Sequence, residues 1–393
     1  MSALLIAALG TIEVILILVT AYVVVLTVGS FLPQKRSHIA SRPAKRFAVL
    51  IPAHDEELLI GVLLDSLNKL DYPRTLFDVH VVADNCTDST ASIAGSYGAE
   101  VHERQDSSLI GKGYALRWLL DEVSRSGQEY DAFIILDADS IVSSNFLRVM
   151  NDRLLAGSLV IQAYYAVANL TDSWSTALRY VALSLVHYLR PMGKRVFGGS
   201  AGLKGNGMCF AASVMRKHGW NTFTLTEDIE YHLKLVSEGI KVDFAPEAVV
   251  WAEMPTSLRG AQSQNMRWER GRLEMIRKYV PRLLWLGLAT RNLAQVDAAL
   301  EQLVPPFSVP VALSGLCLLG SIIVGSQIAT LVAIGLILCQ LLYVIGGLVL
   351  IRAPRHVYLS LLGAPIYVAW KSWLYVAAFS SRRQQKWIRT SRI

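Results

Sequence analysis

The sequence predicts an α/β domain with a Rossmann-like, mostly parallel sheet, joined to α-helical transmembrane segments. Between residues 47 and 136, short apolar strands alternate with helical segments, a pattern typical of a parallel sheet covered on both faces. Long apolar runs flank this stretch on both sides. The chain has 393 residues, of which 53% are hydrophobic and 18% charged, against ~25% charged in soluble domains. This composition excludes a disordered chain and argues against an ordinary soluble enzyme.

The first apolar run covers residues 14–32 and contains no charged residue. About 20 such residues span the hydrocarbon core of a bilayer. A signal peptide would have a shorter apolar stretch and a basic start, so we expect an uncleaved transmembrane helix within 1–32. Glu13 directly precedes the run and is interpreted as an interfacial residue near its outer end, a functional acid inside the membrane being the alternative.

A basic linker, residues 33–46, follows this helix and contains no acidic residue. The positive-inside rule places the linker in the cytosol, and with it the α/β domain at 47–280. We therefore expect an integral protein of the plasma (inner) membrane. The net charge of +7 fits an anionic membrane surface better than nucleic acid, so no nucleic-acid partner is expected. The four cysteines are widely spaced and indicate neither a disulfide framework nor a zinc site.

The C-terminal membrane region is expected at 303–380. Apolar runs at about 307–325 and 328–350 predict a helical hairpin. The run at 357–380 is interrupted by Pro365 and Lys371. The tail that follows it, 381–393, is basic and has no acid. The charge rule therefore favours a re-entrant or interfacial element at 357–380 that returns the tail to the cytosol.

Two further stretches are amphipathic in a way that suits helices on a membrane surface. Residues 281–302 predict one interfacial helix between the α/β domain and the hairpin. Residues 174–190 predict either a membrane-surface helix or a core helix.

The strands of the α/β domain are predicted at 47–52, 77–83, 99–103 and 132–136, with helices at 57–70, 88–97 and 113–124. In such sheets ligands bind beyond the carboxyl ends of the strands. Acidic clusters stand at three of these ends: Ala53-His54-Asp55-Glu56-Glu57, Asp84-Asn85-Cys86-Thr87-Asp88 and Asp137-Ala138-Asp139.

Each acidic cluster has a second interpretation as a helix cap or first-turn acid, and Glu57 and Asp88 are interpreted that way. Asp137 and Asp139, one residue apart after a buried strand, can present oxygens to one hard cation, Mg²⁺ or Mn²⁺. The sequence contains neither the dinucleotide-binding glycine pattern nor a phosphate-binding P-loop motif.

Six motifs in one order resemble the family 2 glycosyltransferases with a GT-A fold. The resemblance covers residues 47–280 and, with Gln-x-x-Arg-Trp and flanking membrane helices, is similar to the membrane-integrated branch of hyaluronan, chitin, cellulose and poly-N-acetylglucosamine synthases. The motifs are Ile51-Pro52-Ala53-His54-Asp55-Glu56, Val81-Val82-Ala83-Asp84-Asn85, Gly111-Lys112-Gly113, Asp137-Ala138-Asp139, Thr226-Glu227-Asp228 and Gln264-Asn265-Met266-Arg267-Trp268.

The resemblance implies a binding site for a UDP-sugar donor. Asp55, Glu56 and Asp84 would hold the uracil and ribose. Lys112 would meet the diphosphate or the sugar, a solvated lysine at a helix start being its alternative role. Arg267 would meet the diphosphate. Asp139 would bind the Mg²⁺ or Mn²⁺, with Asp137 supporting the metal or the sugar. The resemblance also places Pro52, His54 and Ala138 at the donor site. The C-terminal residues Trp387, Thr390 and Arg392 resemble the gating segment of hyaluronan-type synthases, which closes over the bound nucleotide. The alternative is that this segment is a plain basic tail.

The resemblance makes Asp228 the general base, which takes the proton from the acceptor hydroxyl during an inverting displacement at the anomeric carbon. Thr226 and Glu227 complete this motif, and helix capping is their alternative role. The acceptor site is implied at Gln264 and Trp268, whose indole suits stacking on a pyranose, and in the Gly-rich loop 198–208 at Gly205, Asn206 and Gly207.

The leading hypothesis is an inverting, metal-dependent membrane glycosyltransferase that moves a hexose or N-acetylhexosamine from a UDP-sugar to a growing cell-surface polysaccharide. The alternative is a single-transfer glycolipid synthase, because few membrane helices follow the domain. A non-catalytic scaffold or channel component is argued against by the intact Asp139, Asp228 and Gln-x-x-Arg-Trp. The sugar, linkage, acceptor and oligomeric state are left open.

Overall fold

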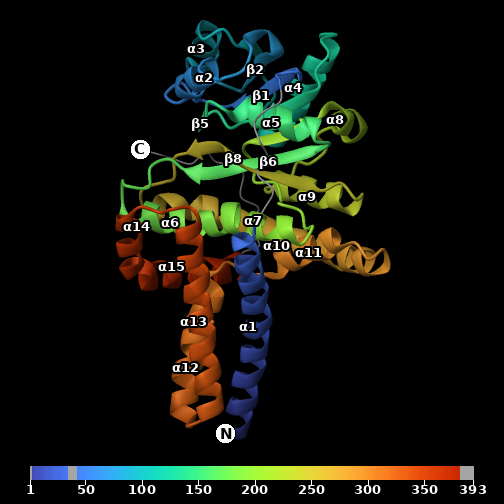
Figure 1. The fold of residues 1–393 in the computed structure, drawn as a ribbon. Helices are drawn as coiled ribbons and strands as arrows, with labels where there is room; N and C mark the ends of the chain where they lie inside the picture. The colour runs from blue at the N-terminus through green and yellow to red at the C-terminus, as the bar shows by residue number, and fades with distance from the viewer. Residues whose placement is uncertain (1, 34–41, 381–393) are drawn as a thin grey trace.

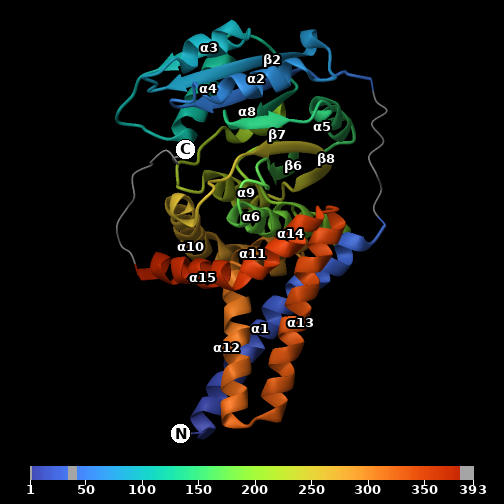
Figure 2. The ribbon, with the colours of Figure 1, turned by 90° about the vertical axis from the view of Figure 1, so that its left-hand side faces the viewer.

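A computed structural model describes residues 2–33 and 42–380 of the chain. The α/β domain lies at one end, a layer of nearly horizontal helices lies beneath it, and α1 (Ser2–Phe31), α12 (Ser308–Val324) and α13 (Gln327–Leu350) project from that layer (Figures 1 and 2). The arrangement suits a domain held at a surface by the projecting helices.

The strands of the described residues form one eight-stranded sheet in the order β3-β2-β1-β4-β7-β6-β8-β5. Four of its neighbouring pairs are parallel and three, all involving β5 or β7, are antiparallel. The predicted mostly parallel sheet is therefore confirmed. The strands are β1 (Phe47–Ala53), β2 (Phe77–Asp84), β3 (Glu100–Arg104), β4 (Ala132–Ile135), β5 (Ser140–Val142), β6 (Val160–Val167), β7 (Met208–Ala211) and β8 (Val242–Ala252).

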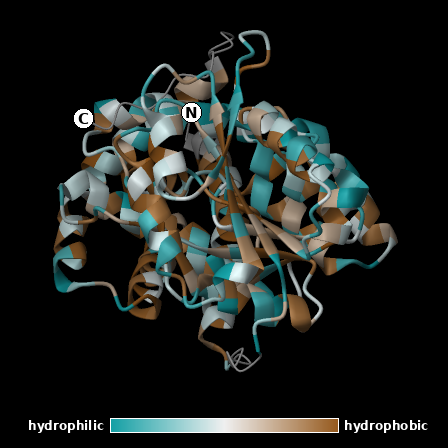
Figure 3. Cartoon of the chain, turned by 90° about the horizontal axis from the view of Figure 1, so that it is seen from above, coloured by the Kyte–Doolittle hydropathy of each residue, from teal (hydrophilic) through white to brown (hydrophobic). Residues whose placement is uncertain are grey.

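Helices cover both faces of the sheet because the central strands are apolar on both sides. In β1, Val49 and Ile51 face one core and Ala48 and Leu50 face the other. Seen from above, the apolar strands run between helices on either side (Figure 3). One face carries α2 (Ile60–Asn68), α3 (Thr90–Ser96) and α5 (Phe146–Leu155), and the other carries α4 (Lys112–Arg125), α8 (Ala212–His218) and α9 (Glu227–Ser237).

The first two helices begin later than the sequence predicts. Helix α2 starts at Ile60 rather than at residue 57, because the chain first turns through Asp55, whose φ is 52°. Glu57 and Asp88 lie just before α2 and α3 rather than in their first turns, and both carboxylates contact amides at the start of α3. The Asp88 carboxylate accepts from the Thr90 amide at 2.9 Å, and the Glu57 carboxylate accepts from the Ser89 amide at 3.0 Å.

The expected single helix over 281–302 is wrong. Helix α10 (Leu258–Ala289) runs on through Pro281, and the chain then reverses at Arg291, whose φ is 53°. Helix α11 (Leu293–Leu303) packs back against α10, with the Asn292 side chain accepting from the Ala294 amide. The boundary at residue 280 thus falls inside a helix, because the apolar period continues smoothly across it.

The stretch 174–190 is a mixed case. Helix α6 (Trp174–Ser184) continues through one π-helical turn into α7 (Arg190–Val196). Leu178 and Leu185 are buried, whereas Trp174 is 45% exposed. Most of this segment is therefore core, and its beginning lies at the surface.

Residues 357–380 form no helix among the candidate membrane spans. They fold into α14 (Arg355–Ser360), a 3₁₀ turn (Leu361–Gly363) and α15 (Ala364–Ser380), and α15 lies along the horizontal layer (Figure 2). Lys371 Nζ lies 2.9 Å from Glu269 Oε1 and 2.5 Å from Asn265 Oδ1, both on α10. The cation is thus paired with the helix layer.

Among the helices that the structure describes, two are long and apolar enough to cross a membrane, Ile6–Phe31 and Gln327–Leu350. Helices α11 and α12 together, bent by 61°, could form a third span. Glu13, expected at the interface near the outer end of the first helix, lies within the candidate span Ile6–Phe31. Its side chain is 6% exposed, and its Oε1 has no hydrogen-bond partner among the described residues.

Candidate active site

The parallel strands β2, β1 and β4 are neighbours, so their carboxyl ends meet at one edge of the sheet. Asp55 and Asn85 leave β1 and β2 with the same φ, 52°, in the left-handed region that few non-glycine residues adopt. The Asp55 Oδ1 accepts from the Thr87 amide at 2.7 Å. This hydrogen bond joins the loops that follow β1 and β2. Pro52 lies within β1 and pairs with Val82 of β2.

The Asp84 carboxylate is mostly enclosed rather than open to a nucleotide. Its side chain is 7% exposed, and its Oδ1 accepts a short hydrogen bond from Nη1 of Arg104, at the end of β3. Burial raises the pKa of Asp84, although Arg104 opposes that shift. His54 Nδ1–H donates to the Asp84 carbonyl at 2.7 Å. Asp55, Glu56 and His54, each partly exposed, are better placed to meet a ligand.

Lys112, the first residue of α4, joins the end of β4, the Gly-rich loop and the first turn of α9. Its Nζ donates to Asp137 Oδ1 at 2.6 Å and to the Gly205 carbonyl at 2.5 Å, and lies 4.0 Å from Glu227 Oε1. Although burial opposes it, the carboxylates of Asp137 and Glu227 raise the pKa of Lys112. The ammonium is therefore held charged at the centre of the site.

Asp137 and Asp139 follow β4 and are both partly exposed, with Ala138 buried between them. Asp137 presents one carboxylate oxygen to Lys112, and Ser140 Oγ lies 3.5 Å from Asp139 Oδ1. Carboxylate oxygens are the donors that Mg²⁺ and Mn²⁺ prefer. The chemistry of this donor pair fits the divalent metal expected from the sequence.

Glu227 and Asp228 lie in the first turn of α9 and face this cluster. A Cβ on Gly205 would lie 3.4 Å from Asp228 Oδ2 and 3.8 Å from Lys112 Nζ, so the loop backbone passes directly over the acid. Burial raises the pKa of Asp228, and burial with the neighbouring Asp228 charge raises that of Glu227 to about 7. A carboxylate with a raised pKa is suited to accept a proton near neutral pH.

Thr226 begins α9 but does not cap it with its side chain. The hydroxyl is buried, with no hydrogen-bond partner among the residues that the structure describes. The Thr226 Cγ2 lies only 2.4 Å from where a Cβ on Gly271 would be. Only glycine at this point of α10 lets the helix approach the acidic motif so closely.

Gln264, Arg267, Trp268 and Gly271 share one face of α10, since residues three and four apart on a helix are neighbours. Burial lowers the pKa of Arg267, and the charges of Glu227, Asp137 and Asp228 oppose that shift. The guanidinium therefore lies within electrostatic reach of all three acids. Gln264 and Trp268 are partly exposed beside it.

Asn206 and Gly207 hold the Gly-rich loop in place rather than face an acceptor. The Asn206 side chain is fully buried, accepting from the Asp137 amide at 3.1 Å and donating to Ser140 Oγ at 2.8 Å. A Cβ on Gly207 would lie 2.8 Å from Val250 Cγ2. Of the three loop residues expected at the acceptor, Gly205 alone borders the acids directly.

Sequence reasoning missed three side chains that shape the site. Arg104 holds Asp84, and buried Gln162 donates to the Asn206 carbonyl at 2.7 Å and accepts from the Lys204 amide at 2.9 Å. Lys204 lowers the pKa of Asp228 by its charge. Of these three side chains, only Lys204 could have been identified from the sequence, because it is a cation inside a Gly-rich apolar loop. Trp387, Thr390 and Arg392 lie outside the described residues.

A buried ionic cluster supports the loop from the side of the projecting helices. Lys194 on α7 is 1% exposed, and its Nζ lies 3.0 Å from Asp297 Oδ2 and 2.6 Å from Glu301 Oε2 on α11. Lys204 Nζ lies 3.9 Å from Glu301 Oε1. Tyr22 of α1 donates to Asp297 Oδ1 at 2.8 Å. The cluster therefore ties α1 to the loop beside Asp228.

The mostly parallel sheet, with acids gathered at the carboxyl ends of its strands, has the arrangement of a GT-A-like fold. A family model described as "Glycosyltransferase like family 2" matches residues 43–271. The chain therefore belongs to that family and is a glycosyltransferase.

Three individual comparisons agree with this assignment. The beta-monoglucosyldiacylglycerol synthase of Synechocystis sp. is 27% identical over 58% of this chain and 48% of its own. The poly-beta-1,6-N-acetyl-D-glucosamine synthase of Staphylococcus epidermidis is 21% identical over 65% of this chain and 60% of its own. The chain thus spans about half to three fifths of these relatives. The structure of a mannosyltransferase from Pyrobaculum calidifontis, solved with GDP-Man and Mn²⁺, has a TM-score of 0.51 at 17% identity, covering 88% of this chain and 96% of that one.

Proposed function

We propose that this protein is an inverting, metal-dependent glycosyltransferase that uses a UDP-sugar donor at a membrane surface. The observation that carries the proposal is the partly buried Glu227–Asp228 pair beside Lys112, with Arg267 in electrostatic reach. This arrangement combines a base with raised pKa and two cations, which are the groups that an inverting displacement of a nucleoside diphosphate requires.

The reaction is one in-line step. The acceptor hydroxyl oxygen forms a bond to the anomeric carbon while the bond from that carbon to the diphosphate oxygen breaks. Asp228 takes the hydroxyl proton. Lys112 and Arg267 balance the negative charge that develops on the departing UDP. Asp55 and Glu56 accept hydrogen bonds from the uracil and ribose.

Asp139 and Asp137 would hold Mg²⁺ or Mn²⁺, which would supply further charge neutralisation at the diphosphate. The mannosyltransferase with the similar fold was solved with Mn²⁺ and a nucleotide sugar, in line with this donor set.

The acceptor that we propose first is a growing cell-surface polysaccharide. Trp268 lies one helical turn from Gly271, which contacts the acidic motif, so a sugar stacked on its indole would be near Asp228. Apolar sugar faces stack well on aromatic rings, and each such stacking contact adds to the binding free energy of a sugar chain. The Staphylococcus relative is named as a synthase of such a polymer.

A second candidate acceptor is a membrane lipid. Helix α1 packs against α12 and α13 through Leu16, Cys317 and Leu336, whose side chains fill the centre of the described bundle. A filled centre favours an acceptor that reaches the site along the membrane surface over a polymer threaded between these helices. The Synechocystis relative is named as a glycolipid synthase.

A direct assay tests both proposals. The purified full chain in detergent is incubated with each radiolabelled UDP-sugar, Mg²⁺ or Mn²⁺, and either oligosaccharide or diacylglycerol acceptors. Gel filtration detects polymer and thin-layer chromatography detects glycolipid. Transfer that is lost in Asp139→Asn, and in wild type with excess EDTA, is the expected result. Full wild-type turnover in EDTA would contradict metal dependence, and absence of any transfer with UDP-sugars would contradict the donor.

We also propose the topology on which this function depends. Helices α1, α12 and α13 would cross the plasma (inner) membrane, α12 as part of the bent span that it forms with α11, with the α/β domain in the cytosol. The composition of these helices and the basic linker support this orientation.

A further inference from the structure

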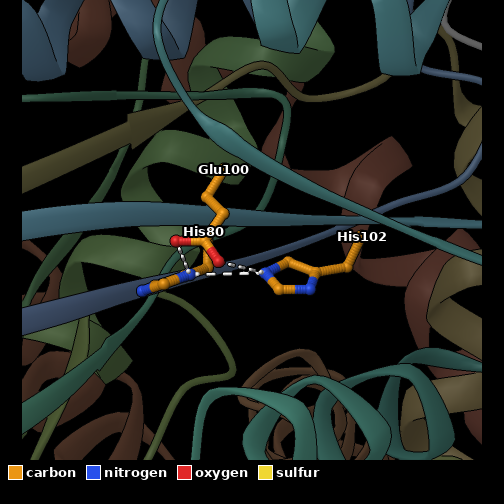
Figure 4. A group of neighbouring side chains, drawn as sticks. All are labelled: His80, Glu100 and His102. Atoms are coloured by element: carbon orange, nitrogen blue, oxygen red, sulfur yellow. Dashed lines mark hydrogen bonds and ion pairs between the residues drawn. The ribbon is translucent and has the colours of Figure 1, made fainter. Parts of the chain in front are cut away.

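Three side chains on β2 and β3 converge at a place that the glycosyltransferase reaction does not use. The parallel register pairs His80 with Glu100, and Val82 with His102. Alternate residues of a strand face the same side, so Glu100 and His102 both face His80. Figure 4 shows the two imidazoles and the carboxylate pointing toward one another. These three residues are called the His–Glu–His cluster below.

The spacing within the His–Glu–His cluster fits a bound metal ion better than it fits hydrogen bonds. His80 Nδ1 lies 3.3 Å from Glu100 Oε2 and 3.4 Å from His102 Nε2, and His102 Nε2 lies 3.7 Å from Glu100 Oε1. Good hydrogen bonds to nitrogen measure about 2.7–3.2 Å. Ligand atoms bound at about 2.0–2.2 Å around a tetrahedral ion lie roughly 3.3–3.6 Å apart.

The neighbours of His80 leave its Nδ1 lone pair facing the cluster. The Tyr130 hydroxyl lies 3.0 Å from Asp78 Oδ2, which can only accept, and also contacts Gln128 Oε1. The tyrosine therefore donates its proton to one of these two oxygens and not to His80. The Tyr130 oxygen therefore accepts from His80 Nε2–H at 3.0 Å. A neutral imidazole with its proton on Nε2 presents bare Nδ1 to the Glu100 carboxylate. A cation between them removes that repulsion.

We propose that His80, Glu100 and His102 bind a divalent transition-metal ion, with Zn²⁺ as the ion that suits the set best. Two imidazoles and one carboxylate are a common zinc ligand set that leaves a fourth position for water or another ligand. Glu100 is 51% exposed, which gives an ion a path from solvent, whereas His80 is 1% exposed and fixed. Tyr130 and Asp78 supply the outer hydrogen bonds that orient a metal-bound histidine.

This site differs from the one proposed for catalysis in chemistry and in place. Imidazole nitrogen selects zinc and its neighbours in the transition series, whereas Asp137 and Asp139 offer only oxygen, which suits Mg²⁺ or Mn²⁺. Strand β1 separates β2 from β4, after which the two aspartates stand. The wide spacing of the cysteines argues against a zinc site built from cysteine, and it does not argue against one built from histidine and glutamate.

The ion would fasten an edge strand next to the donor site. Strand β3 is at the edge of the sheet, and two residues beyond His102 it ends in Arg104, which holds Asp84 at the end of β2. Fixing β3 on β2 would therefore fix Arg104 against Asp84. This consequence rests on the proposed donor site, whereas metal binding itself does not.

Zinc binding can be measured without any activity assay. The full chain, purified in detergent with a tag free of histidine, is stripped with chelator and titrated with Zn²⁺ by calorimetry, with excess Mg²⁺ present to occupy carboxylate sites. We expect one Zn²⁺ per chain and a rise in the thermal midpoint. Co²⁺ should give the visible absorption of a tetrahedral site.

Three variants and one control decide the proposal. Glu100→Gln and His102→Ala should each weaken Zn²⁺ binding at least 10-fold, and Tyr130→Phe about 10–100-fold. His218→Ala is the matched control, because His218 Nδ1 pairs with a single carboxylate, Glu238, at 3.5 Å. Glu100→Gln changes a half-exposed residue, and its thermal midpoint without zinc reports correct folding. Wild-type affinity in both Glu100→Gln and His102→Ala, or no binding to wild type, would overturn the proposal.

Discussion

At the scale of single residues, the proposed mechanism depends on one partly buried acid, Asp228. Asp228 lies under the Gly205 backbone and beside Lys112, with its pKa raised by burial. The motif alone names this residue, but its environment decides its chemistry. The same carboxylate on an exposed helix start would have an ordinary pKa and serve as a first-turn acid.

Replacing Asp228 with Asn should lower the rate of sugar transfer about 10²–10⁴-fold while UDP-sugar affinity stays near wild type. A general base acts on the acceptor proton and not on the donor. Transfer is measured with radiolabelled donor and affinity by calorimetry. Asp121→Asn, on the exposed side of α4, is the matched control. Retention of most of the transfer rate would show that another group is the base.

The pH profile should report the Glu227–Asp228 pair. If Asp228 is the base, as proposed, transfer requires its deprotonated form, and the pKa of Glu227 is raised to about 7 partly by the charge of Asp228. Because like charges raise each other's pKa, Glu227→Gln should lower that of Asp228. The acidic limb of the kcat profile, measured from roughly pH 5 to 9, should then move to lower pH. An unmoved limb would mean that the two acids titrate independently.

Some residue roles were beyond sequence reasoning. Asn206 stands in a Gly-rich loop that predicts substrate contact, yet its amide is used to join that loop to Asp137. Arg104 stands one residue past the predicted third strand, and only the parallel register brings it to Asp84. Such roles depend on which strands are neighbours, and periodicity within one segment does not carry that information.

At the scale of elements, the contact between α9 and α10 sets the geometry of the site. Gly271 lets Thr226 approach, and the same helix face brings Arg267 toward the acids.

The central strands and their helices were predicted correctly because each has a clear apolar period and a turn signal at its end. The break between α10 and α11 was missed because the apolar period of the two helices runs on across the reversal at Arg291.

Gly271→Ala should separate the two helices and impair transfer. The added Cβ would lie 2.4 Å from Thr226 Cγ2, and overpacking of this kind costs about 1–3 kcal/mol. A shift near 1 Å at the base can lower the rate about 10²-fold. Thermal unfolding and transfer rate are measured on the same preparation.

Gly315→Ala is the control for Gly271→Ala, since Gly315 is also helical and a Cβ there meets nothing within 4 Å. It should leave the transfer rate unchanged. Equal rates in the two variants would show that the α9–α10 contact does not position Asp228.

At the scale of the whole molecule, the layer of horizontal helices separates the site from the projecting bundle (Figure 1). Helix α15 belongs to this layer, held through Lys371 and Glu269. The tail beyond it should then lie in the same compartment as the α/β domain, as a segment that closes over a nucleotide requires.

Cysteine labelling tests this topology. In a variant without the four native cysteines, a cysteine at Ser391 should resist an impermeant maleimide in intact cells and react after permeabilisation. A cysteine at Ser326, in the link between α12 and α13, should react in intact cells. Labelling of Ser391→Cys without permeabilisation would place the tail outside and exclude Trp387 and Thr390 from gating.

The buried cluster of Lys194, Asp297 and Glu301, with Tyr22 attached, fixes α1 to the loop above Asp228. Breaking such a buried pair costs about 3–5 kcal/mol, so the catalytic domain does not swing freely on its anchor. If α1 crosses the bilayer as proposed, the height of Asp228 above the lipid headgroups would be a constant of the protein. An acceptor would then be selected by how far its reactive hydroxyl stands out from the membrane, before any contact with its sugar or its chain.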